Sequence, residues 1–230
     1  MDWIGEARKQ GRTALDELAA KQLLASFGIA VPKSRLVRDA AEAIAVAAEL
    51  TAPLVLKVIS PDILHKSDAG GVRVGLQSAA EVGEALRAML KLPAIAGARL
   101  DGFVLEEMAP SGEEIVIGGL RDPDFGPLVM VGLGGIFVEI LKDVSFRICP
   151  ITRLDAGEML GELKGAALLQ GVRGRGPVSQ DAIIDALLRI GGEGGLLLTH
   201  ERDLAETDIN PLIVSASGAV AVDARFVLTP

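Results

Sequence analysis

The sequence predicts a mixed α/β protein, and three observations support that prediction. Half of the 230 residues are hydrophobic and 23% are charged, a composition that can bury a core. Some segments repeat apolar residues with a helical period, whereas others are short apolar runs bounded by glycine, proline and polar residues. The two kinds of segment alternate along the chain, as they do where helices cover a sheet.

The first helix is expected over residues 14–27, because Leu15, Leu18 and Leu23 recur with a helical period and Gly28 follows as a C-terminal cap. The same periodicity predicts further helices at 40–50, 79–90, 154–163 and 181–190. Strands or short apolar segments are expected at 32–37, 53–59, 71–76, 102–107, 114–120, 127–131, 136–141, 144–148, 206–214 and 219–227. No long linker separates these elements, so one compact unit and two small lobes both remain open.

The composition excludes several classes of function. A net charge of −8, with six phenylalanines, one tryptophan and no tyrosine, argues against a surface for nucleic acid. The longest nearly uncharged stretch, 125–138, is too short to span a membrane. The charged N-terminal residues lack the apolar region of a secretory signal, so we expect a cytoplasmic protein. Cys149 is the only cysteine, and we interpret it as a small buried hydrophobe.

Lys57 is the first candidate for a binding residue. It stands alone in the apolar strand 53–59, and an ammonium group is rarely buried without an anionic partner. A lysine that extends from the strand end into solvent is the alternative. We favour an anion ligand, because an unpaired buried charge costs several kcal/mol.

A polar segment, residues 60–71, follows this strand and ends in two glycines. It contains His65, one of only two histidines in the chain, next to lysine, serine and aspartate. Loops often carry catalytic groups, so we interpret the segment as a functional loop. His200 lies among surface charges, and we expect it to be solvated.

Acidic residues surround the turn between the strands 102–107 and 114–120. Glu106, Glu107 and Glu114 could accept hydrogen bonds from ribose hydroxyls, and the backbone near Met108 could contact an adenine edge. A charged hairpin without a ligand would produce the same pattern.

The C-terminal hairpin brings together a more specific group of residues. A loop at 215–218 would pair Val214 with Ala219, and Asn210 would then face Asp223. Asp208 shares that face, because side chains alternate along a strand. Carboxylate and amide oxygens suit Mg²⁺, which often takes only one or two protein ligands beside phosphate and water. A polar, solvent-facing side of a hairpin is the alternative.

The glycine-rich segment 132–139 could form an anion-binding nest of backbone N–H groups. It does not match G-x-G-x-x-G, because Phe137 occupies the last position, and it lacks the lysine of a P-loop. The sequence therefore contains neither of these nucleotide-binding fingerprints.

Three long segments together resemble the ATP-grasp β subunit of ADP-forming (NDP-forming) acyl-CoA synthetases of the acetate–CoA ligase type, and more distantly the succinyl-CoA synthetase β subunit. They are residues 53–75, which include Leu-His-Lys-Ser-Asp-Ala-Gly-Gly, residues 132–147, and Asp-Ile-Asn-Pro-Leu at 208–212. The resemblance implies an ATP-grasp fold of two small α+β lobes with mixed sheets and the nucleotide between them. Lobes of 27–107, and of 1–26 with 108–230, are expected.

The resemblance also implies roles for individual residues. Lys57 would hold nucleotide phosphates, Glu106, Glu107 and Met108 would line the adenine side, and Glu114 would bind ribose. Asn210 and Asp223 match magnesium positions. His65 matches a mobile-loop histidine that receives phosphate from ATP. Asp208 takes the place of a glutamate that orients the phosphohistidine, with a side chain one methylene shorter.

The implied reaction is acid + CoA + ATP ⇌ acyl-CoA + ADP + phosphate, with Mg²⁺ as cofactor. The resemblance assigns CoA binding to a separate α subunit, so we expect an acid–CoA ligase that is active only with that subunit, in an α2β2 assembly. Two alternatives remain: another ATP-grasp carboxylate ligase that forms no phosphohistidine, and a non-catalytic nucleotide-binding regulatory subunit.

Overall fold

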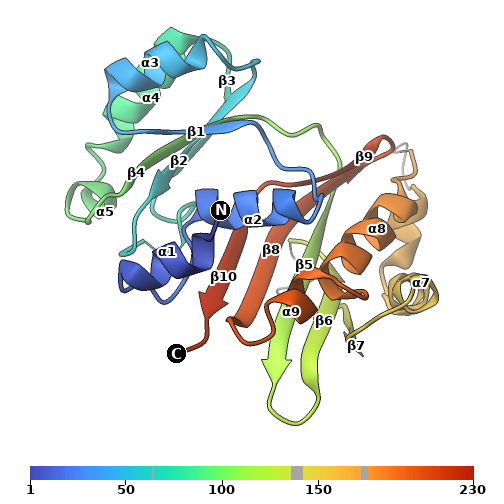
Figure 1. The fold of residues 1–230 in the computed structure, drawn as a ribbon. Helices are drawn as coiled ribbons and strands as arrows, with labels where there is room; N and C mark the ends of the chain where they lie inside the picture. The colour runs from blue at the N-terminus through green and yellow to red at the C-terminus, as the bar shows by residue number, and fades with distance from the viewer. Residues whose placement is uncertain (64, 136–141, 172–175) are drawn as a thin grey trace. The chain divides into compact units, whose positions relative to one another are not determined.

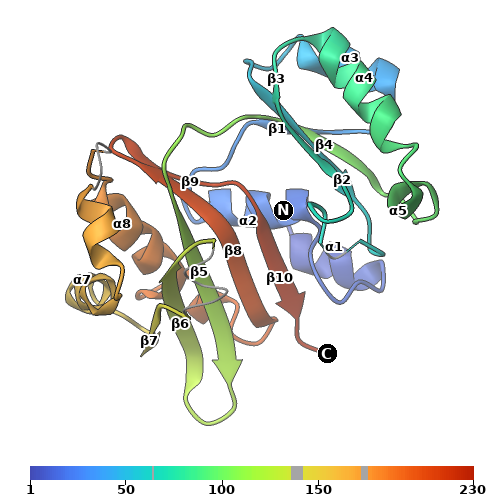
Figure 2. The same ribbon diagram turned by 180° about the vertical axis from the view of Figure 1, so that it is seen from behind.

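The computed structural model describes residues 1–63, 65–135, 142–171 and 176–230, which divide into two compact units. Unit 1 comprises Met1–Val31 and Pro110–Pro230, and unit 2 comprises Pro32–Ala109. These boundaries lie a few residues after those of the expected lobes. Figures 1 and 2 draw the elements of both units, which are described separately below.

Unit 2 is a four-stranded sheet with two helices on one face (Figure 1). Its elements are β1 (Ser34–Val37), α3 (Ala40–Ala47), β2 (Leu54–Ile59), β3 (Val72–Leu76), α4 (Ala79–Met89), α5 (Pro93–Ala96) and β4 (Gly102–Glu107). The strand order is β1-β4-β2-β3, and every pairing is antiparallel. The resemblance implied mixed sheets, whereas this sheet is purely antiparallel. Strands β1 and β2 are joined through α3 and run parallel to each other. They do not pair, because β4 lies between them and is antiparallel to both.

The core of unit 2 lies between its sheet and the helices α3 and α4. Apolar side chains from one face of β2 and β4 pack there against both helices, namely Leu54, Leu56, Val58, Phe103 and Leu105 with Ala43, Val82, Leu86 and Met89. The side chains of Asp39 and Ser78 cap the N-termini of α3 and α4. The helix-facing side of β2 thus supplies the core, and Lys57 belongs to the opposite face.

Unit 1 contains a six-stranded sheet in the order β10-β8-β5-β6-β7, with β9 paired to β8. Its strands are β5 (Glu113–Asp122), β6 (Gly126–Leu133), β7 (Val144–Ile148), β8 (Leu204–Ser215), β9 (Gly218–Ala221) and β10 (Ala224–Leu228). Its helices are α1 (Trp3–Lys9), α2 (Glu17–Ser26), α7 (Arg153–Glu162), the 3₁₀ helix η1 (Ala166–Gln170), α8 (Gln180–Gly191) and α9 (Leu196–Thr199). All of its strand-to-strand pairings in the described residues are antiparallel.

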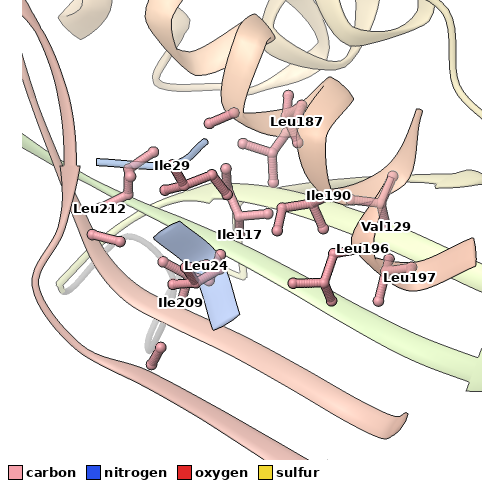
Figure 3. Packing of buried hydrophobic residues seen from close by; sticks show 14 of the residues in the cluster. Leu24, Ile29, Ile117, Val129, Leu187, Ile190, Leu196, Leu197, Ile209 and Leu212 are labelled. Atoms are coloured by element: carbon pink, nitrogen blue, oxygen red, sulfur yellow. The ribbon is translucent and has the colours of Figure 1, made fainter. Parts of the chain in front are cut away.

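One face of the unit 1 sheet is covered by α2, α8 and α9, and Figure 2 shows the opposite face in front of these helices. Figure 3 shows the core between sheet and helices, with Leu24, Ile117, Leu187, Ile190 and Ile209 packed together. The sheet therefore has a core face and an outer face, and the exposed side chains of Glu114 in β5 and Glu206 in β8 belong to the outer one.

Most expected elements are present, with corrected ends. The helix expected at 14–27 begins at Glu17, because the Asp16 side chain caps it, and Gly28 follows it with φ +79° as predicted. The strand expected at 219–227 is divided into β9 and β10. The short helices α1, α5, η1 and α9 were not expected, and the segment 136–141 lies outside the described residues. In the described ranges, no helix combines the length and the apolar character that a membrane crossing requires.

Candidate functional site

Lys57 forms a buried ion pair with Glu106 within unit 2. Its Nζ atom lies 2.9 Å from Glu106 Oε1, and the two residues are only 7% and 1% exposed. The sheet register explains the contact: Val55 pairs with Glu106 across β2 and β4, so Lys57, two residues further along β2, is the diagonal neighbour of Glu106 on the same face. The sequence predicted an anionic ligand for Lys57; the anion that the structure shows beside it is the carboxylate of Glu106, and the ligand stays a prediction.

The end of β4 is held by hydrogen bonds to neighbouring loops. Glu107 Oε1 accepts the N–H of Thr51 at 2.9 Å, and the N–H of Met108 donates to Pro53 O at 2.8 Å. The Met108 side chain is 42% exposed. Because the N–H of Met108 is engaged, a contact of this residue with adenine would involve its carbonyl oxygen or its side chain.

His65 is exposed on the loop between β2 and β3. The two ends of the loop are anchored in unit 2: Ser60 Oγ donates to Arg99 O at 2.7 Å, and the N–H of Val58 donates to Gly71 O at 2.8 Å. Gly70 has φ +69°, a conformation that favours glycine. The imidazole is thus presented to solvent by a loop with fixed ends.

The terminal hairpin of unit 1 has the register predicted from the sequence. Val214 pairs with Ala219, and the N–H of Asn210 donates to Asp223 O at 3.2 Å. The same register continues into β10, where Asp208 pairs with Arg225. Asn210 therefore faces Asp223, with Asp208 two residues away on the same strand.

A β-bulge in β8 lies at this point of the sheet. Ile117 of β5 pairs with Ile209 and Ile115 pairs with Leu212, so Asn210 and Pro211 together oppose one residue of β5. Because of the extra residue, Ile209 and Leu212 both face the core, while Asn210 is exposed. The bulge thus shifts the alternation of core-facing and outward-facing residues in β8 at the candidate metal ligand Asn210.

Negative charge is concentrated around this bulge. Burial raises the pKa of Asp208 above its usual value, the nearby carboxylates of Glu206 and Asp223 raise it further, and Arg225 partly opposes the shift. In the described ranges, no group of three or more His, Cys, Asp or Glu residues could hold a metal ion by itself. The donor set of one amide and one carboxylate, Asn210 and Asp223, fits a Mg²⁺ ion that phosphate and water also coordinate.

Glu114 lies on the outer face of β5, next to the start of the glycine-rich segment. The N–H of Gly134 donates to Glu114 O at 2.7 Å, and a Cβ added to Gly134 would lie 2.7 Å from Glu114 Cβ. Glycine is therefore required for this close approach. The second half of the predicted nest, 136–139, lies outside the described residues.

The sequence did not reveal the polar network of Arg147. Its guanidinium binds both carboxylate oxygens of Glu162 in α7, with Nη1 3.0 Å from Oε2, and Ser145 donates to the same carboxylate. Hydrogen bonds from Arg147 and Ser145 lower the pKa of Glu162 to about 2. A contact between a strand and a helix this far apart in the sequence leaves no local signal.

The nine predicted site residues belong to different units. Unit 2 contains Lys57, His65, Glu106, Glu107 and Met108, and unit 1 contains Glu114, Asp208, Asn210 and Asp223. Within its own unit, each set contains neighbouring residues: Lys57 with Glu106, and Asn210 with Asp223 and Asp208.

Comparison with known proteins gives matches along almost the whole chain. Residues 6–228 match the family model of the ATP-grasp domain. The β subunit of acetate–CoA ligase [ADP-forming] I from Pyrococcus furiosus is 42% identical over 236 aligned residues, which cover 99% of this chain and 100% of that subunit.

Two solved structures of an acetyl-coenzyme A synthetase, described as dinucleotide forming, from Ca. Korarchaeum cryptofilum are also similar. One, in complex with coenzyme A, Ca-AMPCP and HgCl+, has a TM-score of 0.92 at 42% identity, with 99% of each chain covered. The other contains coenzyme A and Mg-AMPPCP, and its phosphohistidine segment points towards the nucleotide-binding site. Its TM-score is 0.86 at 42% identity, again over 99% of each chain.

Proposed function

Because this chain belongs to the ATP-grasp domain family, with an ADP-forming acetate–CoA ligase β subunit as a full-length relative, we propose that it is the nucleotide-handling β subunit of an ADP-forming acyl-CoA synthetase. The net reaction is acid + CoA + ATP ⇌ acyl-CoA + ADP + phosphate. The observation that carries the proposal is the exposure of His65 on a loop with fixed ends, in a chain 42% identical to a protein whose phosphohistidine segment points towards nucleotide.

In the first step, the neutral imidazole of His65 attacks the terminal phosphorus of ATP. A nitrogen–phosphorus bond forms, the bond between that phosphorus and the bridging oxygen breaks, and ADP leaves with the electron pair. The ammonium of Lys57 balances charge on the phosphate oxygens. The phosphorylated loop then delivers the group to a second site, which a histidine within a strand could not do.

The other site residues have supporting roles in the proposal. Glu114 binds the ribose and Met108 contacts the adenine. Asn210 and Asp223 hold Mg²⁺, which when bound neutralises part of the phosphate charge. Asp208 orients the phosphohistidine. The carboxylates of Glu106 and Glu107 are already engaged by Lys57 and Thr51, which supports Met108 as the main adenine contact from this segment.

The second half of the reaction requires a partner. The Pyrococcus furiosus relative is named as a β subunit, and this chain has no G-x-G-x-x-G fingerprint for CoA. We therefore assign CoA binding and the acyl group to an α subunit, in an α2β2 complex. A cytoplasmic location is part of the same proposal, since ATP is the substrate and the chain has only one cysteine, which is free.

Phosphorylation of the protein tests this function directly. The chain is incubated with Mg²⁺ and ATP labelled at the γ-phosphate, and acid-labile, base-stable label is measured on the protein. His65→Ala should abolish the label. His200→Ala is the matched control, because His200 is the only other histidine and its Nδ1 lies 3.5 Å from Asp203. Label that persists in His65→Ala would contradict the proposal, and no label in the wild type would favour a ligase without phosphohistidine.

A further inference from the structure

The buried pair of Lys57 and Glu106 has no obvious role in stability. Its face of β2 and β4 also contains the apolar residues Val55, Ile59 and Val104, each no more than 9% exposed. Removing two charges from water is costly, and an apolar pair of similar volume often stabilises a buried site equally well or better. An ion pair at this position is therefore compatible with a role beyond stability.

The geometry of the pair suggests what Glu106 does. Lysine has a flexible four-carbon stem, and holding its ammonium in one place requires a fixed partner. Glu106 belongs to the neighbouring strand, where the backbone register fixes its position relative to Lys57. An ammonium group can donate three hydrogen bonds, so a bond to one carboxylate oxygen is compatible with a bond to phosphate.

We propose that Glu106 is a positioning residue, whose carboxylate holds the Lys57 ammonium in the orientation that binds nucleotide phosphate, and that Glu106 does not itself contact the adenosine. This inference rests on the proposed function, in which Lys57 binds phosphate. It replaces the role that the resemblance implied for Glu106, which was to line the adenine side.

The test compares binding of Mg·ADP and of adenosine, measured by calorimetry on the full chain. Glu106→Gln should weaken Mg·ADP binding by about tenfold or more, because the phosphate contact depends on a well-placed charged donor. Adenosine has no phosphate, so its affinity should change less than twofold. Equal weakening of both ligands, or no weakening of Mg·ADP, would overturn the inference.

A double-mutant cycle with Lys57→Met supplies a second measurement, which decides the question if adenosine binds too weakly. If Glu106 acts through Lys57, adding Glu106→Gln to Lys57→Met should weaken Mg·ADP binding no further. If the two effects multiply, Glu106 contacts nucleotide independently and the inference is wrong. If Lys57→Met alone leaves Mg·ADP binding unchanged, the role of Lys57 in the proposed function fails instead.

Loss of folding is controlled by a matched pair in unit 1. Lys21 Nζ lies 2.7 Å from Glu17 Oε1 in α2, and these residues are 1% and 6% exposed. Glu17→Gln breaks a buried lysine–glutamate pair as Glu106→Gln does, but it should leave Mg·ADP affinity within twofold.

If Glu106→Gln does not fold, the apolar double variant Lys57→Met, Glu106→Leu replaces it. This variant should fold and bind Mg·ADP no more weakly than Lys57→Met alone, and weaker binding would contradict the inference.

Discussion

At the scale of single residues, Glu162 shows how strongly the fold perturbs an exposed carboxylate. Arg147 binds both of its oxygens and Ser145 donates to one, and these hydrogen bonds lower its pKa to about 2. A carboxyl group whose pKa is lower in the folded than in the unfolded chain stabilises the fold above its unfolded value, which is about 4.3. That contribution is lost as the pH falls towards 2.

Glu162→Gln should therefore lower the melting temperature at pH 7 by a small amount, about one or two degrees, because exposed pairs contribute little. The difference from wild type should persist at pH 5 and be clearly smaller at pH 3, where the wild type has lost part of its own contribution. Melting curves recorded by circular dichroism across this range provide the measurement. Glu158→Gln is the control, because Glu158 Oε2 lies 3.9 Å from Arg147 Nη2, beyond hydrogen-bond distance. A difference that grows towards low pH would refute this account.

Sequence reasoning at this scale succeeded where chemistry or a local register decided the answer. The apolar strand around Lys57 indicated that its ammonium would lie beside an anion, although the one observed is Glu106 and not a ligand, and the short loop after Val214 was enough to place Asn210 opposite Asp223. The partners of Lys57 and of Arg147 could not be predicted. Both depend on which distant segments pack together, and nothing near either residue in the sequence encodes that.

At the scale of elements, β5 contains two adjacent glycines whose side-chain positions face opposite sides of the sheet. A Cβ on Gly119 would lie 2.4 Å from Thr207 Oγ1 and 2.6 Å from a terminal carbon of Leu197, and both residues are buried. A Cβ on Gly118 would meet the terminal methyl of Met130 at 2.9 Å, which a flexible side chain can relieve.

Gly119→Ala should destabilise the protein by about 1–3 kcal/mol, the usual cost of overpacking a core, whereas Gly118→Ala should cost clearly less. Urea unfolding followed by tryptophan fluorescence and circular dichroism gives the two free energies of unfolding. The alanines differ by one position in the same strand, so strand propensity is matched. Equal losses in the two variants would show that the core face of β5 is not tightly packed at Gly119.

Element ends illustrate what the sequence could not predict. Gly28 correctly marked the end of α2, but Asp16 caps its start and the helix begins later than the apolar period suggested. The strand expected at 219–227 is divided into β9 and β10 opposite the bulge at Asn210 and Pro211. A bulge adds one residue to a strand, so the side chains that follow it point to the opposite faces. The apolar and polar residues of the sequence then no longer alternate regularly, and the assignment of faces becomes ambiguous.

At the scale of the whole molecule, the sequence motifs were more informative than composition. Composition and periodicity predicted an α/β chain, and three long motifs identified the ATP-grasp family, to which the chain belongs. The two units, each with its own apolar core, could not be derived from periodicity, because no linker separates them and unit 1 is built from both ends of the chain.

This organisation leads to a prediction about division of labour. The chain contains the candidate groups for phosphoryl transfer, but its sequence contains no G-x-G-x-x-G fingerprint. Alone, it should exchange label between ADP and ATP through phosphorylated His65 and produce no acyl-CoA. With the cognate α subunit, each acyl-CoA formed should be accompanied by one ADP and one phosphate.

The experiment measures acyl-CoA formation from acetate, CoA and Mg·ATP by the chain alone, by the α subunit alone and by their mixture. In the mixture, His65→Ala should be inactive and His200→Ala should be active. Acyl-CoA production by the isolated chain would refute the division, because a single subunit would then bind both nucleotide and CoA.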